Sequence, residues 1–331
     1  MSRRSALTLL SGLGVLAAAT SDQAQSPTAD QQDQPLYARA EFGLASGVSP
    51  NRNVVNGGLH ESERRLDTTV RLAGSFINFD TRWSDQQDRW DDLGAGGRTV
   101  ALAWGPARNE KTVLLNEVAA GNYQDHVDDI LSGISNYPHP VVCRWGWEMN
   151  GNWSEYSAAY QGEYKGCADP SEYVAAWRYM VDRSRALRVP NLRWLFCPNG
   201  NDVGGNTMEQ YWPGADYVDL IGADAYNGFG YWTTFYRLFA RPYERLSALK
   251  PGADFWVGET GCIEATQSEF SKAGWAQQMF HETRLPLLRA VTYFDAVGSR
   301  DWRIHTSEAS QQAFRTGFRL VAGTRFARPS P

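Results

Sequence analysis

Eight short runs rich in β-branched and aromatic residues alternate with longer segments of helical period along this chain of 331 residues. Such alternation predicts an α/β protein. Eight strand and helix pairs spread over roughly 290 residues are typical of a (β/α)8 barrel, the TIM barrel, formed as a single domain. No GxGxxG motif follows the first run. An open doubly wound sheet that binds a dinucleotide is therefore the weaker alternative.

The predicted strands are short and apolar, and most of them end near polar or glycine-rich residues. We expect them in ARAEFGLA (38–45), LAGSFINF (72–79), TVALAWG (99–105), VVCRWGW (141–147), LRWLFC (192–197), YVDLIGAD (217–224), DFWVGE (254–259) and AVTYFDA (290–296).

Apolar residues spaced by three and four positions mark the helices between these strands. The spacing is clear over residues 127–134 and 173–181, where it places the apolar side chains on one face. Asp169 followed by Pro170 predicts the start of the second of these helices, with a side-chain cap and a proline in its first turn.

Residues 1–25 have the features of an export signal peptide. A pair of arginines precedes an apolar run of small residues (6–19) that is too short for a stable membrane anchor. The SRRSAL segment also resembles a twin-arginine signal. We expect residues 26–36 to be a disordered linker and residues 37–331 to form the barrel domain. The mature protein is then secreted, with no membrane association after signal removal.

The charge and the metal-ligating residue types exclude several classes of partner. The net charge is −5 and the basic residues are scattered, so we expect no nucleic-acid-binding surface. The five histidines have no paired spacing and the cysteines form no CxxC pair, which argues against a metal site. We therefore expect no cofactor, no metal and a monomer.

The four cysteines, Cys143, Cys167, Cys197 and Cys262, leave two alternatives open. Disulfides are common in exported proteins, and the sequence alone does not choose among the pairings. Cys143 and Cys197 also lie inside apolar strand runs, where buried free thiols are common.

Two glutamates have the same context at the ends of predicted strands. Glu148 lies in VVCRWGWEMNGNW and Glu259 in FWVGETGC. Because the carboxyl ends of barrel strands meet at one mouth, the two carboxylates are expected to face each other. Such a pair suits glycoside hydrolysis, in which one group protonates the departing oxygen and the other attacks the anomeric carbon or activates water. The alternative is that either glutamate is a buried structural partner of an arginine such as Arg144 or Arg71.

RWGWEMNGNW resembles the acid/base motif of glycoside hydrolase family 26, and VGETG resembles its nucleophile motif. Further segments are similar to the family in the same order along the chain: FGLASGVSPN, ALAWGP, LRWLFCPN, GADAYN and DWRI. The resemblance therefore extends over almost all of the chain that follows the predicted signal and linker.

The resemblance implies an exported, retaining endo-β-glycosidase that acts on a polysaccharide by double displacement. Glu148 would be the general acid/base, Glu259 the nucleophile, and Tyr226 the residue that orients the nucleophile by a hydrogen bond. Trp145, Trp147 and the charge of Glu259 would raise the pKa of Glu148. The substrate would contact Trp104, Trp147, Asn150, Trp153, Asp224 and Trp302.

One position departs from the family pattern. Trp147 directly precedes the acid/base candidate Glu148, at a position where the family usually has His or Asn, which removes a hydrogen-bonding group expected near the sugar. The substrate is therefore left open between a β-1,4-mannan and a β-1,3/1,4-glucan. The alternatives are an unusual polysaccharide, a transglycosylase with the same pair of glutamates, and a catalytically silent barrel that binds polysaccharide.

Overall fold

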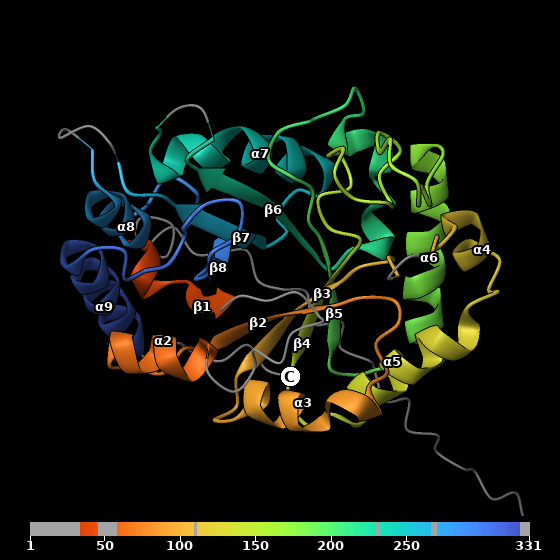
Figure 1. Ribbon diagram of the computed structural model, residues 1–331, viewed down its shortest axis with the longest axis horizontal. Helices are drawn as coiled ribbons and strands as arrows, with labels where there is room; N and C mark the ends of the chain where they lie inside the picture. The colour runs from red at the N-terminus through yellow and green to blue at the C-terminus, as the bar shows by residue number, and fades with distance from the viewer. Residues whose placement is uncertain (1–33, 46–57, 109–110, 230–231, 266–269, 325–331) are drawn as a thin grey trace, which may run out of the picture.

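Eight parallel strands close into a barrel in the computed structural model, which describes residues 34–45, 58–108, 111–229, 232–265 and 270–324. Each strand pairs with its neighbour in the sequence, and the last pairs with the first. Helices surround the ring of strands (Figure 1). The predicted single-domain (β/α)8 barrel is confirmed, whereas the predicted signal peptide lies outside the described residues.

A strand overlaps each of the eight predicted runs. The strands are β1 (Glu41–Ala45), β2 (Leu72–Ile77), β3 (Thr99–Trp104), β4 (Val141–Trp145), β5 (Leu192–Phe196), β6 (Leu220–Asn227), β7 (Phe255–Cys262) and β8 (Leu288–Phe294).

The seventh strand is longer than predicted. It pairs with β6 as far as Asn227 and Cys262, so that Glu259 lies inside β7 and not at its end. The threonine and glycine that follow Glu259 would suit a loop. In the folded sheet, however, hydrogen bonds to β6 satisfy the backbone N–H and C=O groups of this segment, so the strand continues.

The helices are α2 (Gly58–Leu66), α3 (Gln87–Gly94), α4 (Leu115–Ala119), α5 (Gln124–Asn136), α6 (Pro170–Ala186), α7 (Phe235–Leu249), α8 (Lys272–Phe280) and α9 (Glu308–Gly323). Short 3-10 turns are η1 (Leu36–Ala38), η2 (Ser84–Gln86), η3 (Met208–Tyr211) and η4 (Ala215–Tyr217).

Local signals at two of these elements can be checked directly. The Asp169 side chain accepts a hydrogen bond from the backbone N–H of Ser171 at 2.9 Å, and Pro170 is the first residue of α6, so the predicted cap is confirmed. Leu36 of η1 is fully buried in the core. The ordered domain therefore includes at least the last residue that the sequence assigned to the linker.

The core has two parts because strand residues alternate between the two faces of the barrel wall. On β4, Val141 and Cys143 belong to the large cluster between strands and helices. Val142 belongs to a smaller cluster inside the barrel, contributed by Leu72, Val142, Leu195, Cys197, Leu220, Trp256 and Ala290. The next inward position on β4 is Arg144, which places a charged side chain directly above the apolar floor of the barrel.

The four cysteines are all buried and unpaired. The free-thiol alternative for Cys143 and Cys197 is thus confirmed, and the disulfide alternative is wrong, because strand register directs these thiols into separate parts of the core. Within the ranges that the structure describes, no helix has the length and apolar character needed to cross a membrane.

Candidate active site

Glu259 on β7 is held by two donors that come from β4 and β6. The Arg144 guanidinium donates through Nη2 to Oε1 of Glu259, and the Tyr226 hydroxyl donates to Oε2 at 2.5 Å. Glu259 is only 6% exposed. Since each carboxylate oxygen accepts a hydrogen bond and one donor is a cation, these contacts fix the orientation of the carboxylate.

Arg144 also pairs with a second buried carboxylate. Its Nη1 lies 2.5 Å from Oδ2 of Asp224, and the Cys197 thiol donates to Oδ1 at 3.1 Å. Burial raises the pKa of Asp224 to about 7, against the opposing effect of Arg144. Burial would lower the pKa of Arg144, but the charges of Asp224 and Glu259 raise it well above its ordinary value. The guanidinium therefore stays charged.

A glycine on β7 makes room for this network. A Cβ at Gly258 would lie 2.5 Å from Oδ1 of Asp224 and 2.6 Å from Sγ of Cys197. Both contacts are closer than real Cβ atoms allow, so the glycine before Glu259 is required for the buried ion pairs to form.

Glu148 lies in the turn that follows β4, and its backbone is in the left-handed region at φ +56°. This conformation is uncommon for a residue with a side chain, and it clusters at functional sites. The backbone N–H of Glu148 donates to the carbonyl of Cys197 at 2.9 Å, and its carbonyl accepts from Gly151 at 2.9 Å. Hydrogen bonds to the end of β5 thus hold the strained residue in place.

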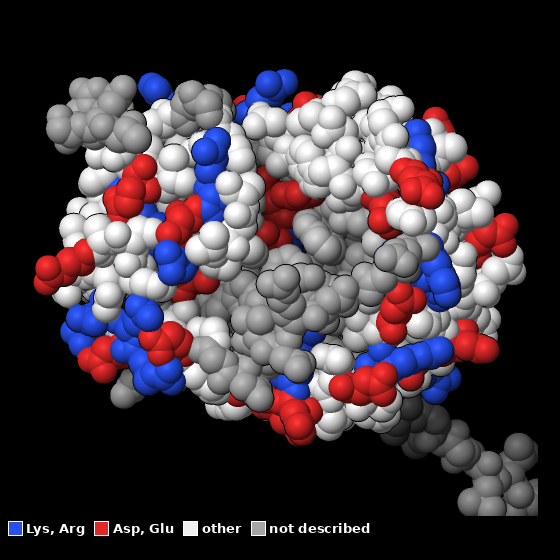
Figure 2. Space-filling view, in the orientation of Figure 1, with Lys and Arg blue, Asp and Glu red and all other residues white. Residues whose placement is uncertain are grey.

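The carboxyl group of Glu148 lies in an environment that favours its protonated form. Burial, followed by the charges of Asp224 and Glu259, raises the pKa of Glu148 well above its ordinary value. The hydrogen bond from Nε1 of Trp153 to Oε2, at 2.8 Å, opposes this shift in part. Because the charges of the carboxylates affect one another, Glu148, Asp224 and Glu259 share one site. Figure 2 shows acidic side chains within a hollow near the centre of one face.

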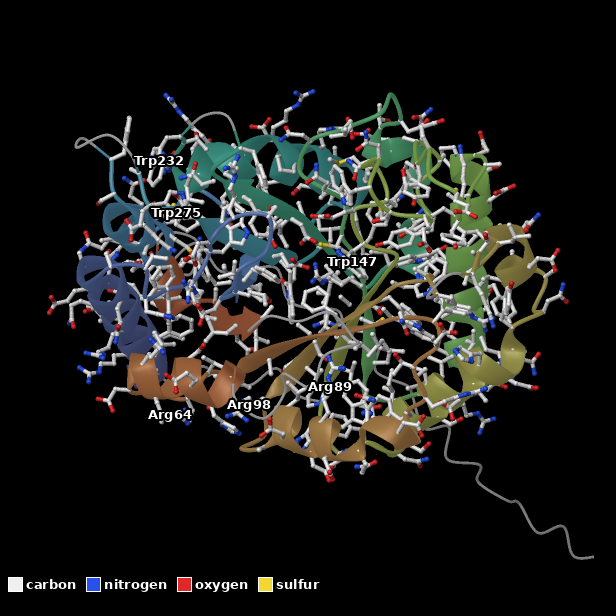
Figure 3. The ribbon with its side chains drawn as sticks, in the orientation of Figure 1. Arg64, Arg89, Arg98, Trp147, Trp232 and Trp275 are labelled. Atoms are coloured by element: carbon white, nitrogen blue, oxygen red, sulfur yellow. The ribbon has the colours of Figure 1, made fainter. Side chains whose placement is uncertain are left out.

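Three of the predicted sugar-contacting tryptophans border this site. Trp153 is 46% exposed beside Glu148. The Trp302 ring lies 4.8 Å from the Tyr226 ring, although only 2% of Trp302 is exposed. Trp147 is half-buried and packs edge-on against Phe76, with their centroids 5.8 Å apart. Figure 3 shows it near the centre of the barrel.

The structure corrects three other predicted substrate contacts. Trp104 is fully buried and stacks on Phe79 in the core, because its position on β3 faces the helices. Asp224 is fully buried against Arg144 and Cys197. Asn150 is fully buried as well, and its side chain joins two loops. The polar atoms of Asp224 and Asn150 thus contact protein partners, and none of the three side chains is exposed.

Sequence reasoning also missed contacts. Cys197 was considered only as a core thiol, yet its side chain contacts Asp224. Phe229 is 51% exposed, and its ring lies 5.5 Å from Trp302. Arg144 does pair with Glu259, as the structural alternative proposed. Arg71 precedes β2 at the opposite end of the barrel and donates to the carbonyl of Thr324.

Across the described part of the chain, no group of three or more His, Cys, Asp or Glu side chains has the arrangement of a metal site. The charged groups of the site are instead paired with one another, with Arg144 as the central cation.

A closed parallel barrel that brings two glutamates together near the carboxyl ends of its strands is the architecture of (β/α)8 glycosidases. The model of glycosyl hydrolase family 26 matches residues 108–280, and the chain belongs to this family.

Curated relatives agree with this membership. The chain is 25% identical over 287 residues to Endoglucanase H of Acetivibrio thermocellus, covering 83% of this chain and 30% of that protein. It is 29% identical over 201 residues to Mannan endo-1,4-beta-mannosidase A and B of Caldalkalibacillus mannanilyticus, covering 60% of this chain and 36% of that protein. The chain thus spans about a third of the length of these relatives.

A solved structure supports the fold. The catalytic domain of the GH26 endo-beta-1,4-mannanase of Bacillus sp. JAMB-750 superposes with a TM-score of 0.61 at 16% identity, covering 87% of this chain and 89% of that one. At this identity the likeness concerns the barrel itself.

Proposed function

We propose that this protein is a secreted, retaining endo-β-glycosidase that hydrolyses a β-linked polysaccharide of the β-1,4-mannan or β-1,3/1,4-glucan type. The proposal rests chiefly on the different environments of its two glutamates. Glu259 has a hydrogen-bond donor on each oxygen, whereas burial and neighbouring charge raise the pKa of Glu148. One ionised and one protonated carboxyl group are what double displacement at a glycosidic bond requires.

In the first step, Glu259 attacks the anomeric carbon while Glu148 donates its proton to the glycosidic oxygen. The bond between that carbon and that oxygen breaks, and an ester joins the sugar to Glu259. In the second step, ionised Glu148 takes a proton from water, which attacks the same carbon and releases Glu259 as a carboxylate. Two inversions retain the configuration of the anomeric centre.

The contacts around Glu259 suit this sequence of events. Arg144 and Tyr226 hold and aim the attacking carboxylate. When the ester forms, the negative charge on Glu259 disappears. One of the charges that raises the pKa of Glu148 is then removed. Glu148 therefore holds its proton until the first step and is stable as a carboxylate in the second.

Aromatic side chains on either side of the glutamates would bind the sugar units. Trp153 lies beside Glu148, and Phe229 lies beside Trp302 on the side of Tyr226. Exposed aromatic faces of this kind bind the apolar faces of sugars. Trp147 lies closer to the charged centre, between Phe76 and Tyr156.

The substrate type in this proposal follows the two kinds of relative, one named an endoglucanase and the other a mannan endo-1,4-beta-mannosidase. Secretion rests on the signal-like residues 1–25. The protein would act as a monomer on a polysaccharide, without a cofactor.

Hydrolysis of a panel of soluble glycans tests the proposal. Wild type and Glu259→Ala would be incubated with glucomannan, galactomannan, barley β-glucan, xylan and laminarin, and the products sized by chromatography. Glu244→Gln is a matched control, because Glu244 is an exposed carboxylate of the outer helix α7. We expect internal cleavage of one glycan by wild type and by the control variant, and none by Glu259→Ala.

Proton NMR of the first products tests the stereochemical part. The β-anomer should be the first product of a retaining enzyme. Initial release of the α-anomer would contradict double displacement. Binding of a glycan without any release by wild type would favour a silent binding barrel, and products longer than the substrate would favour a transglycosylase.

A further inference from the structure

Trp147 lies directly before Glu148, but it contacts Arg144, which pairs with the other glutamate, Glu259. Its ring packs against Phe76 at 5.8 Å and Tyr156 at 6.0 Å. A Cβ at Gly105 would come within 3.3 Å of it. The indole is therefore wedged over the ends of β2 and β3, on the inner side of the barrel wall.

The Arg144 guanidinium packs against two of these rings, which also contact each other. Its Cζ is 5.5 Å from the Phe76 centroid and 5.6 Å from the Trp147 centroid, distances within the range of cation–π attraction. Phe76 and Arg144 are inward-facing residues of β2 and β4, each above an apolar residue of the barrel floor. The two rings and the guanidinium thus form one packed unit, which we call the aromatic clamp (Phe76, Arg144 and Trp147).

Arg144 needs such support because its carboxylate partners contact only its two terminal nitrogens. Nη1 pairs with Asp224 and Nη2 with Glu259. Nε is buried and has no hydrogen-bond partner among the described residues. These carboxylates do not cover the faces of the guanidinium plane. The negative faces of aromatic rings can stabilise such a cation once it has lost its water.

We propose that Trp147 is a positioning residue for the nucleophile: with Phe76 it packs against the Arg144 guanidinium, so that Nη2 stays on Oε1 of Glu259. The proposal rests on the proposed function, since it gives Trp147 a role in the same reaction. It explains why a large aromatic side chain occupies the position before Glu148 and yet lies against an arginine. It also separates Trp147 from the residues that contact the sugar.

Two substitutions separate the aromatic face from the volume of the side chain. Trp147→Phe keeps a ring over Arg144, whereas Trp147→Leu keeps apolar bulk but no π face. Tyr236→Leu is the matched control. Tyr236 lies on the outer helix α7, and its ring centroid is 3.9 Å from Cζ of Arg284, so this variant removes a ring from a guanidinium outside the site. Thermal unfolding of each variant would show whether it folds.

Rates on two substrates distinguish the possible roles of Trp147. The first is the polysaccharide that wild type cleaves, and the second is a dinitrophenyl β-glycoside, whose leaving group does not need protonation. We expect Trp147→Leu to lower kcat about tenfold or more on both substrates with little change in KM. Trp147→Phe should stay within about threefold of wild type, and Tyr236→Leu should equal wild type.

Several results would overturn the proposal. A loss confined to the polysaccharide would mean that Trp147 acts through Glu148. A raised KM with unchanged kcat would mean that it binds the sugar. Equal activity of the Phe and Leu variants would mean that only its volume matters.

A spectroscopic readout keeps this test separate from the proposed function. The Nε–H NMR signal of Arg144, assigned by its loss in Arg144→Lys, should carry a ring-current shift that is reduced in Trp147→Leu and in Phe76→Leu. An unchanged signal would show that no clamp exists, whether or not the protein cleaves any glycan. An inactive wild type with the expected shifts would refute the proposed function and leave the clamp intact.

Discussion

The Tyr226 hydroxyl donates a hydrogen bond of 2.5 Å to Oε2 of Glu259. Burial and then the charges of Glu259 and Glu148 raise the pKa of Tyr226 well above its ordinary value. The phenol therefore stays protonated over the range in which a glycosidase works. The hydroxyl therefore remains a donor to the carboxylate over this whole pH range, whereas a group with a lower pKa would lose its proton.

Removal of this hydroxyl tests its contribution to catalysis. Tyr226→Phe should lower kcat by about 10-fold to 100-fold, since a hydrogen bond to a charged group contributes about 1.5–3 kcal/mol. The measurement is steady-state kinetics on the glycan that wild type cleaves. Tyr243→Phe is the control, because that hydroxyl accepts a hydrogen bond from Leu287 outside the site. Equal losses in the two variants would contradict the assigned role.

The alkaline limb of the rate profile should report on Glu148. As the proton donor it must be protonated, and its pKa is raised, so kcat/KM should fall only at a pH well above the ordinary carboxyl range. Trp153→Phe removes a hydrogen bond that lowers this pKa. The limb should then move to still higher pH. Movement toward lower pH in Trp153→Phe would show that another group controls the limb.

Glu148 should also cost stability at neutral pH. Its pKa is higher in the folded than in the unfolded protein, so the folded state binds the proton more tightly between the two values, and stability falls as pH rises through that window. Glu148→Gln should therefore raise the unfolding temperature by about 2–4 °C at pH 7. The difference should vanish near pH 4. Calorimetry at both pH values, with Glu244→Gln as control, measures it.

Asn150 should matter for stability and for the placement of Glu148. Its amide donates to the carbonyls of Asn199 and Asn201 and to Asp202, and its carbonyl accepts from the N–H of Asn199. Asn150→Ala should cost about 2–4 kcal/mol, because it leaves several buried polar groups unsatisfied. It should also lower kcat, because it frees the turn that carries Glu148.

Asn191 offers a matched comparison for this prediction. It lies directly before β5, and its amide donates to the backbone carbonyls of Ile134, Tyr137 and His139. Asn191→Ala should lose similar stability in denaturant unfolding but keep the kcat of wild type. A normal kcat in Asn150→Ala would show that the loop does not position Glu148.

The buried cysteines predict the redox behaviour of the protein. All four are unpaired, and burial raises the pKa of Cys167 and of Cys262 to about 12. We expect no reaction with a thiol reagent in the native state and four reactive thiols after unfolding without reductant. A reductant should leave the unfolding temperature unchanged. Fewer than four thiols would reveal a disulfide.

Strand positions and the class of chemistry could be predicted because their signals are local. Apolar runs ending in glycine and polar residues marked all eight strands, and Asp169 with Pro170 marked the start of α6. Two glutamates in similar contexts indicated one shared site, since parallel strands of a barrel end on the same side.

The roles of single side chains were harder to predict. Trp104, Asn150 and Asp224 were expected to contact sugar, but each is fully buried against other parts of the protein. Inward and outward faces of a strand differ by a single position, and Trp104 falls on the outward one. A loop asparagine has the same appearance in the sequence whether it binds a ligand or another loop.

The sequence by itself determined the barrel, the order of its strands and the two glutamates at its mouth, because periodicity and strand ends are properties of neighbouring residues. Only the tertiary structure decided which groups surround those glutamates. Arg144 meets partners 80 and 115 positions away in the chain, and Phe76 and Trp147 both pack against its guanidinium. Burial and charge pairing arise from such long-range contacts, so they are set when the barrel closes.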